Sequence, residues 1–551
     1  MTWLQLVLLF GYLGLSAALY TLFPKAGRSA THALIPGYNM WVVAQLVGRK
    51  GWHSLWLLIP YLNVFIFAGL MVDLARSFGR FSFGEHVLSV IASWGYFAWI
   101  GKEAAPYDPA LVANPVTPTN QVRYYGPVLE IERQYQRELK AAMATKQNRE
   151  VNKVSAAYPQ FQKPFYQDWA EAAVFAVFAA AFIRLLLIES YIIPTPSMEG
   201  NLNVGDFLFV SKVHYGLRLP QTLLMIPLAH NRAPLVNAES YIDAGQLPYR
   251  RLPKIQNVNR FDPVVFNVPA GDSVYVTPWR VYYPHDIRTN SAPPQVLNAI
   301  NNGSLELITR PVDKRDHYVK RCIGLPGERF EIRDKVVYID GEAIEDPENV
   351  QYSYYINGAP PIVPEEWRDL NISLDDLQAG EGGQDLIFLS NEQKAALEAM
   401  DPNLEIEPRI TGPGVRYYPH DARYFSDMAN DNYGPVVIPE RGMTIKLDAR
   451  TYALYWRCIR VYEGNPDFVA RDGQFFLNGQ AITEYTFQLD YFWMMGDNRH
   501  NSEDSRVWGF VPETHILGKP LFVWMSLKEG SLRNGVNWHR IGRSAMTTGG
   551  L

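Results

Sequence analysis

Two residues of this chain, a serine and a lysine, could together perform nucleophilic chemistry. The serine, Ser197, lies in the run Pro194-Thr195-Pro196-Ser197-Met198, where two prolines hold the chain extended and prevent a helix from continuing. A serine hydroxyl is a poor nucleophile until a base takes its proton. On this run alone a cap or turn serine is the more ordinary interpretation, so the hypothesis depends on a base for Ser197.

Lys320 is the candidate base, because burial lowers the pKa of a lysine from its ordinary value of about 10.4. It lies in a strand-like run at residues 317–323. Alternation along a strand places Tyr318, Lys320 and Cys322 on one face. A strand lysine that reaches to water is the competing interpretation, and Lys212, on the strand that follows Ser197, is a weaker rival base.

Histidine is the more usual base for a serine, and the chain has eleven histidines. None lies in a recognisable triad motif; the nearest candidates are His317, His500 and His515, which surface or packing roles suit better. The sequence has no Cys/His spacing for zinc, no acidic calcium loop and no glycine-rich phosphate loop, so we expect no metal and no cofactor. The two cysteines, Cys322 and Cys458, are compatible with a disulfide or with two reduced thiols.

The elements that position these residues begin with apolar stretches. Four stand out, at about 3–23, 55–72, 86–101 and 171–193, and we interpret each as a membrane crossing. No basic region precedes the first, which favours a retained anchor over a cleaved signal peptide. Lysine and arginine gather at 25–50 and 102–167, which the positive-inside rule places in the cytoplasm. The N-terminus and everything after Pro194 would then lie outside.

Two charged residues, Arg184 and Glu189, fall within the fourth stretch. Their spacing is not ideal for a direct pair on a helix, and we expect a structural anchor rather than a proton path. The net charge of −5 over 551 residues argues against a nucleic-acid partner, and the length exceeds one ordinary domain.

After residue 204, short apolar strands alternate with turn signals, which predicts a mainly β domain. The predicted strands are 207–213, 263–268, 318–324, 329–333, 336–339, 474–477, 491–495 and 521–525. Segments rich in Pro, Asn, Asp and Gly are predicted to be long loops or insertions, at 217–257, 273–312 and 343–440. Within the last, 346–439 is interpreted as a small subdomain with a helix at 391–400.

We therefore predict five segments. They are a three-span membrane region at 1–104, a cytoplasmic linker with an amphipathic helix at 105–168, a transmembrane anchor at 169–193, a β domain at 194–530 with an insertion at about 345–440, and a C-terminal tail at 531–551.

An internal similarity relates residues 321–344 to residues 457–482. Each copy has Arg-Cys-Ile followed by a hairpin-like run with an Asp-Gly or Asn-Gly turn. We favour chance slightly over duplication. Only the first copy follows a lysine, since Lys320 precedes it and Trp456 precedes the second.

Three sequence blocks together resemble the bacterial type I signal peptidases, and they occur in that family's order. They are PTPSM after an apolar span, DHYVKRCIGLPGE from residue 316, and the very specific MMGDNRHNSEDSRVWGFVP from residue 494. The resemblance covers the fourth apolar stretch and the core strands of the β domain, and it leaves out residues 1–165 and the large insertions. The multi-span N-terminus and the insertions resemble the long form of Bacteroidetes-type bacteria.

The resemblance implies a membrane-bound serine endopeptidase that has N-terminal transmembrane α-helices and a mainly β extracytoplasmic catalytic domain. Ser197 matches the nucleophile and Lys320 the general base. Thr195 matches a hydroxyl that helps the Ser197 N–H to hold the oxyanion, although the family often has Ser there. Ser502 matches a serine that orients the lysine amine. His500 stands where the family frequently has Asp or Asn, and we assign it no role.

Further positions are implied by the same resemblance. The residues that match the lining of shallow pockets for small side chains are Ile193, Met198, Leu202, Tyr318 and Val319. The residues that match polar groups bracing the site are Arg321, Asp497, Asp504 and Arg506, and we expect them to be paired structural charges.

The implied substrates are exported preproteins, cleaved after small residues at an A-x-A boundary. A substrate would bind extended, by β-addition near Tyr318, with its apolar region in the lipid bilayer. The secretion translocon is a further candidate partner, and the implied location is the bacterial inner membrane, multi-pass, with the catalytic domain on the periplasmic side. Two alternatives remain, a non-catalytic membrane scaffold with this fold and a Ser/Lys processing hydrolase with another substrate.

Overall fold

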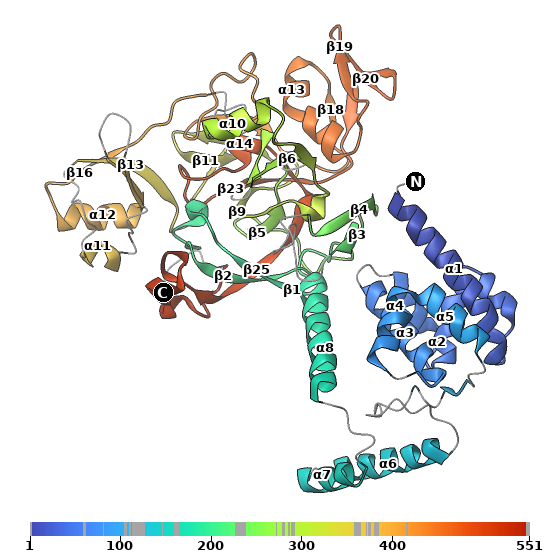
Figure 1. Cartoon of the computed structure of the whole chain (residues 1–551). Helices are drawn as coiled ribbons and strands as arrows, with labels where there is room; N and C mark the ends of the chain where they lie inside the picture. Colours follow the sequence, from blue (N-terminus) through green and yellow to red (C-terminus); the bar gives the residue numbers. More distant parts are fainter. Residues whose placement is uncertain are drawn as a thin grey trace. The chain divides into compact units, whose positions relative to one another are not determined.

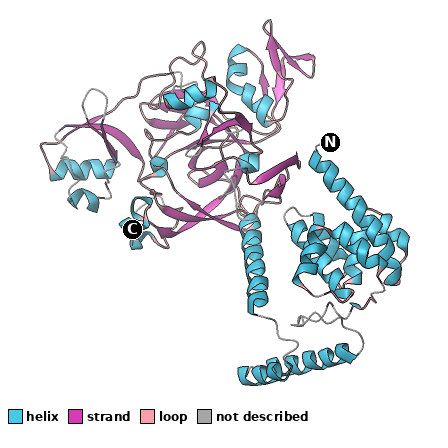
Figure 2. Ribbon diagram, viewed as in Figure 1, coloured by secondary structure: helices cyan, strands magenta, loops and turns pink. Residues whose placement is uncertain are grey.

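The structure is a computed structural model of the whole chain. It describes residues 3–58, 62–80, 82–103, 107–109, 112, 127–145, 147–158, 165–225, 239–270, 273–277, 281–284, 287, 292–357, 365–370, 372, 376–379, 385–414 and 417–546. Two compact units are present, unit 1 (residues 1–182 and 222–247) and unit 2 (residues 183–221 and 248–551). Helices dominate unit 1 and strands dominate unit 2 (Figures 1 and 2).

Unit 1 contains a helical bundle with an apolar core. Its buried core includes Leu19, Phe23, Val43, Met71 and Phe97, none of which is exposed. The helices are α1 (Trp3–Lys25), η1 (Ala30–Leu34), α2 (Tyr38–Leu46), η2 (Gly51–Leu58), α3 (Leu62–Ser77), α4 (Phe83–Ile91), α5 (Ser93–Lys102), α6 (Pro127–Ala144), α7 (Asn148–Ala157) and most of α8 (Phe165–Leu186). The strands β3 (Thr222–Met225) and β4 (Tyr241–Gln246) form an antiparallel pair.

The four predicted membrane crossings do not correspond to four long helices. The second stretch is divided between η2 and α3, and the third between α4 and α5, which meet at Ala92. The fourth ends at Leu186 instead of residue 193, because residues 188–192 form a strand. Within the described residues, no helix has both the length and the apolar character that a bilayer crossing requires.

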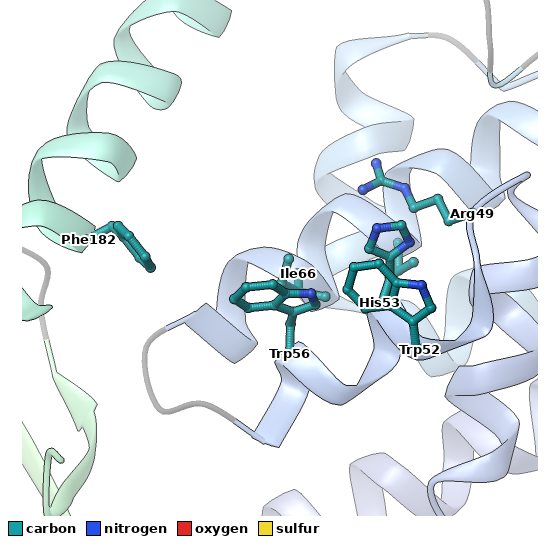
Figure 3. A pocket seen from close by; sticks show the side chains of 7 residues that line it. Arg49, Trp52, His53, Trp56, Ile66 and Phe182 are labelled. Atoms are coloured by element: carbon teal, nitrogen blue, oxygen red, sulfur yellow. The ribbon is translucent and has the colours of Figure 1, made fainter. Parts of the chain in front are cut away.

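A pocket lies among the helices of unit 1. Side chains that border it include Arg49, Trp52, His53, Trp56 and Ile66 (Figure 3). None of the residues predicted to carry chemistry lines this pocket.

Unit 2 is built on a seven-stranded antiparallel sheet. Its strand order is β1 (Ile188–Ile192), β2 (Asp206–Ser211), β25 (Ile516–Ser526), β5 (Pro263–Asn267), β9 (His317–Gly324), β23 (Tyr491–Met495) and β24 (Val511–Pro512). Every residue of β5 and of β23 is buried, and all of these residues except Asn267 are apolar or aromatic. All eight predicted strands are confirmed, with shifts of a few residues at their ends.

Smaller sheets extend this scaffold. One has the order β12 (Glu342–Ile344), β11 (Val336–Ile339), β10 (Arg329–Arg333) and β17 (Tyr433–Val437). Others are β7 (Val281–Tyr282), β6 (Ser273–Val276) and β8 (Leu307–Thr309); β18 (Thr444–Lys446) and β22 (Glu484–Thr486); and β19 (Val469–Arg471), β20 (Gln474–Leu477) and β21 (Gln480–Ile482). Short helices connect them, among them α10 (Pro294–Asn301), α13 (Ala449–Arg457) and α14 (Ser505–Trp508).

The two similar segments of sequence have the same structure in their hairpins but not in their Arg-Cys-Ile parts. The hairpins β11–β12 and β20–β21 have the same register, and each turns through two successive residues with positive φ, Asp340-Gly341 and Asn478-Gly479. The Arg-Cys-Ile parts differ, because residues 321–323 lie in β9 while residues 457–459 lie where α13 passes into η9 (Cys458–Tyr462). The two copies therefore share a hairpin and not a site.

The long insertion contains a small sheet with two helices and an apolar core. A sheet of order β14 (Leu377–Ala379), β15 (Asp385–Ser390), β13 (Gln351–Asn357) and β16 (Glu405–Pro408) packs with α11 (Glu365–Asp369) and α12 (Asn391–Met400). Its own apolar core includes Trp367, Ile387, Leu389 and Leu397. The predicted helix begins at a capping box formed by Ser390 and Gln393. We call residues 351–408 the insertion subdomain (Figure 1).

The predicted C-terminal tail is folded onto the main sheet as far as residue 546. Arg540 forms a buried ion pair with Asp206 at the start of β2, with Nη2 2.5 Å from Oδ2. Ser544 forms a bridge with Phe522 of β25, and Ala545 is fully buried. These residues therefore belong to the sheet that carries the site.

Candidate active site

Ser197 and Lys320 lie on neighbouring parts of the main sheet. Ser197 is the middle residue of a one-turn helix, Pro196–Met198, in the connection from β1 to β2. Lys320 lies in β9, where it is paired with Val264 of β5. β9 is an interior strand of the sheet, so its central side chains are shielded from solvent. Lys320 is 4% exposed. The structure brings the two predicted dyad residues together.

The contact between the two side chains is direct. Lys320 Nζ lies 2.5 Å from Ser197 Oγ, which is hydrogen-bond distance. Ser197 is 8% exposed, so little water surrounds the pair. The Tyr318 ring centroid lies 5.4 Å from Nζ, in agreement with the predicted shared face of the strand.

Burial changes the acid–base character of Lys320. Loss of water is the largest effect and lowers the pKa of the amine from 10.5 to about 8, although the carboxylates of Asp504, Glu503 and Asp497 act in the opposite direction. About a tenth of the Lys320 amines are therefore neutral at pH 7. A general base must be neutral to accept a proton. Lys212, the rival base, is instead 2.7 Å from Glu189 Oε2 in an ion pair.

A loop from Gly496 to Ser502 packs against Ser197. The Asn498 N–H donates to the Ser197 carbonyl oxygen at 3.2 Å. A Cβ at Gly496 would fall on that carbonyl oxygen and on Ser502 Oγ, so the close approach of the loop requires glycine. Sequence reasoning missed Gly496 and Asn498, although both lie in the most specific of the three sequence blocks.

The predicted bracing charges are paired, two by two. Arg321, directly after Lys320 in sequence, donates from Nε and Nη2 to the two carboxylate oxygens of Asp497, at 2.7 Å and 2.5 Å. Arg506 contacts Asp504 in the same way, at 2.9 Å and 2.7 Å. The other oxygen contacts of Asp504 include the Gly496 N–H at 3.0 Å. All four residues are at most 1% exposed, so the pairs fix the loop rigidly.

The two residues predicted to orient the reacting groups are Ser502 and Thr195. Ser502 Oγ is buried and forms no hydrogen bond with the described residues, so the predicted bond to the Lys320 amine is not made. Thr195 is exposed and extended, with φ −134° and ψ 150°, and caps no helix. Their roles stay predictions.

The predicted pocket residues form the apolar floor next to the serine. Ile193, Met198 and Leu202 are at most 4% exposed and pack in one core cluster, against which Val319 is partly buried. Tyr318 is half-buried in the adjacent cluster. The first three side chains are core residues in this conformation, and their contact with substrate stays a prediction.

Other predicted groups have partners away from the dyad. His515 Nε2 lies 2.9 Å from Arg315 Nη1, and the His317 ring packs edge-on against Tyr191 at 4.9 Å. Cys322 and Cys458 are both buried and free. Among the described residues no group of three or more His, Cys, Asp or Glu side chains is arranged to hold a metal ion.

Arg184 and Glu189 do pair, contrary to the expectation from helical spacing. Arg184 Nε lies 2.7 Å from Glu189 Oε1. The helix ends at Leu186 and Glu189 lies on β1, so helical spacing does not apply. Lys212 and Tyr191, whose OH donates to Glu189 Oε2 at 2.6 Å, complete a buried structural cluster.

Comparison with known proteins shows what the chain is similar to. The family described as "Signal peptidase, peptidase S26" matches residues 166–361 and 470–525, and a family of unknown function matches residues 31–108. Signal peptidase I of Haemophilus influenzae is 25% identical over 366 residues, which cover 65% of this chain and 69% of that protein. Signal peptidase I of Buchnera aphidicola (subspecies Acyrthosiphon pisum) is 25% identical over 381 residues, covering 67% and 80%.

Signal peptidase I of Pseudomonas aeruginosa is 21% identical over 392 residues, covering 69% of this chain and 80% of its own. The matched family segments contain β1, β2, β5, β9 and β25 of the main sheet, together with Ser197 and Lys320, while most of the insertion subdomain lies outside them. Over these segments the chain is therefore similar to the signal peptidases of peptidase family S26.

Proposed function

We propose that this protein removes N-terminal signal peptides from exported preproteins, with Ser197 as nucleophile and Lys320 as general base. The similarity to signal peptidases supports the reaction and the substrate class. The observation that carries the residue assignment is the 2.5 Å contact between Lys320 Nζ and Ser197 Oγ in a nearly dry environment.

The reaction follows from this contact. The neutral Lys320 amine takes the proton of Ser197 Oγ while that oxygen attacks the carbonyl carbon of the scissile peptide. The resulting ammonium gives the proton to the leaving amine, and an acyl-enzyme remains on Ser197. Lys320, neutral again, then takes a proton from water, which attacks the ester and releases the signal peptide.

The negative charge that develops on the carbonyl oxygen requires donors. The Ser197 backbone N–H and the Thr195 hydroxyl are the proposed donors, and one such donor is typically worth ~3 kcal/mol of barrier. The fixed position of Ser197 supports this assignment, because its carbonyl is held from below by Asn498 and its turn is anchored by flanking prolines.

The proposed substrate binds extended beside β9 and presents small side chains near Ser197. The buried side chains of Ile193, Met198 and Leu202 leave little depth beside the serine, which favours Ala over bulky residues. This preference agrees with the A-x-A boundary of secretory signal peptides.

We also propose that the protein works at the bacterial inner membrane with its site on the periplasmic side, near the secretion translocon. The support is the apolar sequence that precedes Ser197 and the membrane-bound nature of a signal peptide's apolar segment. Recovery of the full chain in a membrane fraction that resists alkaline carbonate extraction is the expected result. Recovery in the soluble fraction would contradict this part of the proposal.

The test of the reaction uses the full chain in detergent and a precursor with an Ala-x-Ala boundary. Mass spectrometry should find the mature N-terminus directly after the second alanine. Ser197→Ala and Lys320→Ala should each reduce cleavage to background. Matched controls are Ser190→Ala, an exposed serine on β1, and Lys519→Met, a half-buried lysine of the same sheet. Both controls should keep activity, and full activity in either dyad variant would refute the assignment.

A further inference from the structure

The insertion subdomain is attached directly to the loop beneath Ser197. The Gln351 N–H donates to the Asp497 carbonyl oxygen and the Arg499 N–H donates to the Gln351 carbonyl oxygen, both at 2.8 Å. Gln351 and Asn498 form a parallel bridge, so β13 begins as an extra strand against this loop. The same Asn498 holds the Ser197 carbonyl, so the insertion subdomain and the nucleophile contact opposite sides of one short segment.

The side chain of His500 adds a second attachment. Its Nδ1 lies 2.6 Å from Ser353 Oγ and 3.2 Å from Ser353 N, on β13. Its Nε2 lies 2.7 Å from Asp431 Oδ1, where the chain returns from the insertion toward β17. Asp431 Oδ2 in turn accepts from the N–H and the hydroxyl of Thr411, both at 2.7 Å. His500 therefore joins the start and the end of the insertion to the active-site loop.

The partners determine the protonation of the ring. A backbone N–H can only donate, so Nδ1 must be an unprotonated acceptor from Ser353. Nε2 then carries the proton and donates to Asp431. The neutral imidazole fits all of these partners, whereas a protonated ring would present an N–H to the Ser353 N–H and lose that bond.

Ser353, His500 and Asp431 have the residue types of a hydrolytic triad, but they do not form a second site. Ser353 is 0% exposed, and the His500 and Asp431 side chains are 1% and 3% exposed, so no substrate reaches them. Nδ1 is also occupied by the Ser353 N–H. The network is structural in position and is set apart from the dyad.

We propose that neutral His500 is a positioning residue that aligns Ser197 and Lys320 by clamping the insertion subdomain onto the 496–502 loop. The inference rests on the proposed function. Both ends of the dyad depend on this loop, because Asn498 holds Ser197 and Asp497 holds Arg321, the neighbour of Lys320. Release of the clamp moves the loop and lowers the rate of chemistry without changing substrate contacts.

The surroundings of His500 set when the clamp opens. Asp431 favours the charged ring, while Arg506 and Lys335 oppose it. The Tyr352 ring packs edge-on at 5.5 Å, and Asp346 is paired with Arg499. Burial is the largest effect and lowers the pKa of His500 below its ordinary value, so the clamp stays closed at neutral pH and opens only in acid.

The experiment measures kcat and kcat/KM for precursor cleavage against pH in wild type, His500→Asn and His539→Asn. Asn supplies an acceptor in place of Nδ1 and does not titrate, and His539 is an exposed histidine that serves as the matched control. In wild type, the acid limb of log kcat/KM should steepen from slope one to slope two, since Lys320 and His500 both require deprotonation. His500→Asn should keep slope one, with kcat about tenfold lower at pH 8 and KM unchanged. His539→Asn should behave as wild type.

An acid limb of slope two in His500→Asn, or an unchanged kcat, would overturn the positioning role. A measurement on the wild type does not depend on the variant's folding. NMR of the His500 ring should show the Nε2–H tautomer, and the ring should titrate within about one pH unit of the break in slope. A charged ring at neutral pH would overturn the inference. Activity that survives Ser197→Ala would instead refute the proposed function, so the two failures are distinguishable.

Discussion

Replacement of Lys320 by methionine should abolish cleavage and yet make the folded protein more stable. Methionine has nearly the length of the lysine stem and carries no charge. In the wild type, folding lowers the pKa of the amine from 10.5 to about 8. One pKa unit corresponds to about 1.4 kcal/mol, so burying the ammonium costs about 3 kcal/mol of folding free energy at pH 7. The lost hydrogen bond to Ser197 offsets about 1 kcal/mol. The net expected stabilisation is about 2 kcal/mol.

The stability difference between Lys320→Met and wild type should depend on pH. A lysine whose folded pKa is lowered destabilises the protein fully below pH 8, and the penalty disappears as the pH rises from 8 to 10.5. The advantage of Lys320→Met should therefore be largest at pH 7 and fall steadily toward pH 10. Urea unfolding of the full chain, followed by tryptophan fluorescence and repeated at each pH, measures it. A variant that is less stable than wild type at pH 7, or an advantage independent of pH, would refute a dry amine at this position.

Three further outcomes follow from the same geometry. Wild-type kcat/KM should rise about tenfold per pH unit up to about pH 8, because only the neutral form of Lys320 accepts a proton; a flat profile between pH 6 and pH 8 would contradict that base. Gly496→Ala should lower kcat at least about a hundredfold, since its Cβ would collide with the Ser197 carbonyl and Ser502 Oγ, and a crystal structure should show the loop displaced. Ser502→Ala should leave the stability within about 1 kcal/mol of wild type, because Oγ makes no hydrogen bond with the residues that the structure describes; any large loss of kcat would then reveal a bond that forms only with substrate bound.

Much of the catalytic unit was predictable from the sequence because its strands are strongly patterned. β11 and β23 are short apolar runs, and β10 alternates apolar with charged residues. The structure places these strands and β9 where they were predicted. The Ser197–Lys320 contact could be predicted only from the order of three sequence blocks. Periodicity places Lys320 on one face of a strand. Its partner Ser197 lies 123 positions away in sequence, and their contact depends on the order of strands in the sheet, which no local pattern contains.

The helical part was predicted less well, since hydropathy alone does not locate breaks. A continuous apolar run from 86 to 101 hides the change of helix at Ala92, and the run from 171 to 193 hides the strand that begins at Ile188. That strand pairs with β2, and tertiary pairing overrides the helical tendency of the preceding residues. The role of His500 was also hidden, because Ser353 and Asp431 lie far away in sequence and belong to a segment without a recognisable motif.

The buried ion pair between Asp206 and Arg540 links the start of β2 to a residue 334 positions later. Arg540 also donates to the Asn201 carbonyl oxygen at 2.9 Å, inside the short connection that carries Ser197. Loss of the Arg540 side chain would leave the buried carboxylate of Asp206 without its counter-charge and the Asn201 carbonyl oxygen without this donor. The connection that holds the nucleophile is therefore braced by a side chain from a distant part of the polypeptide.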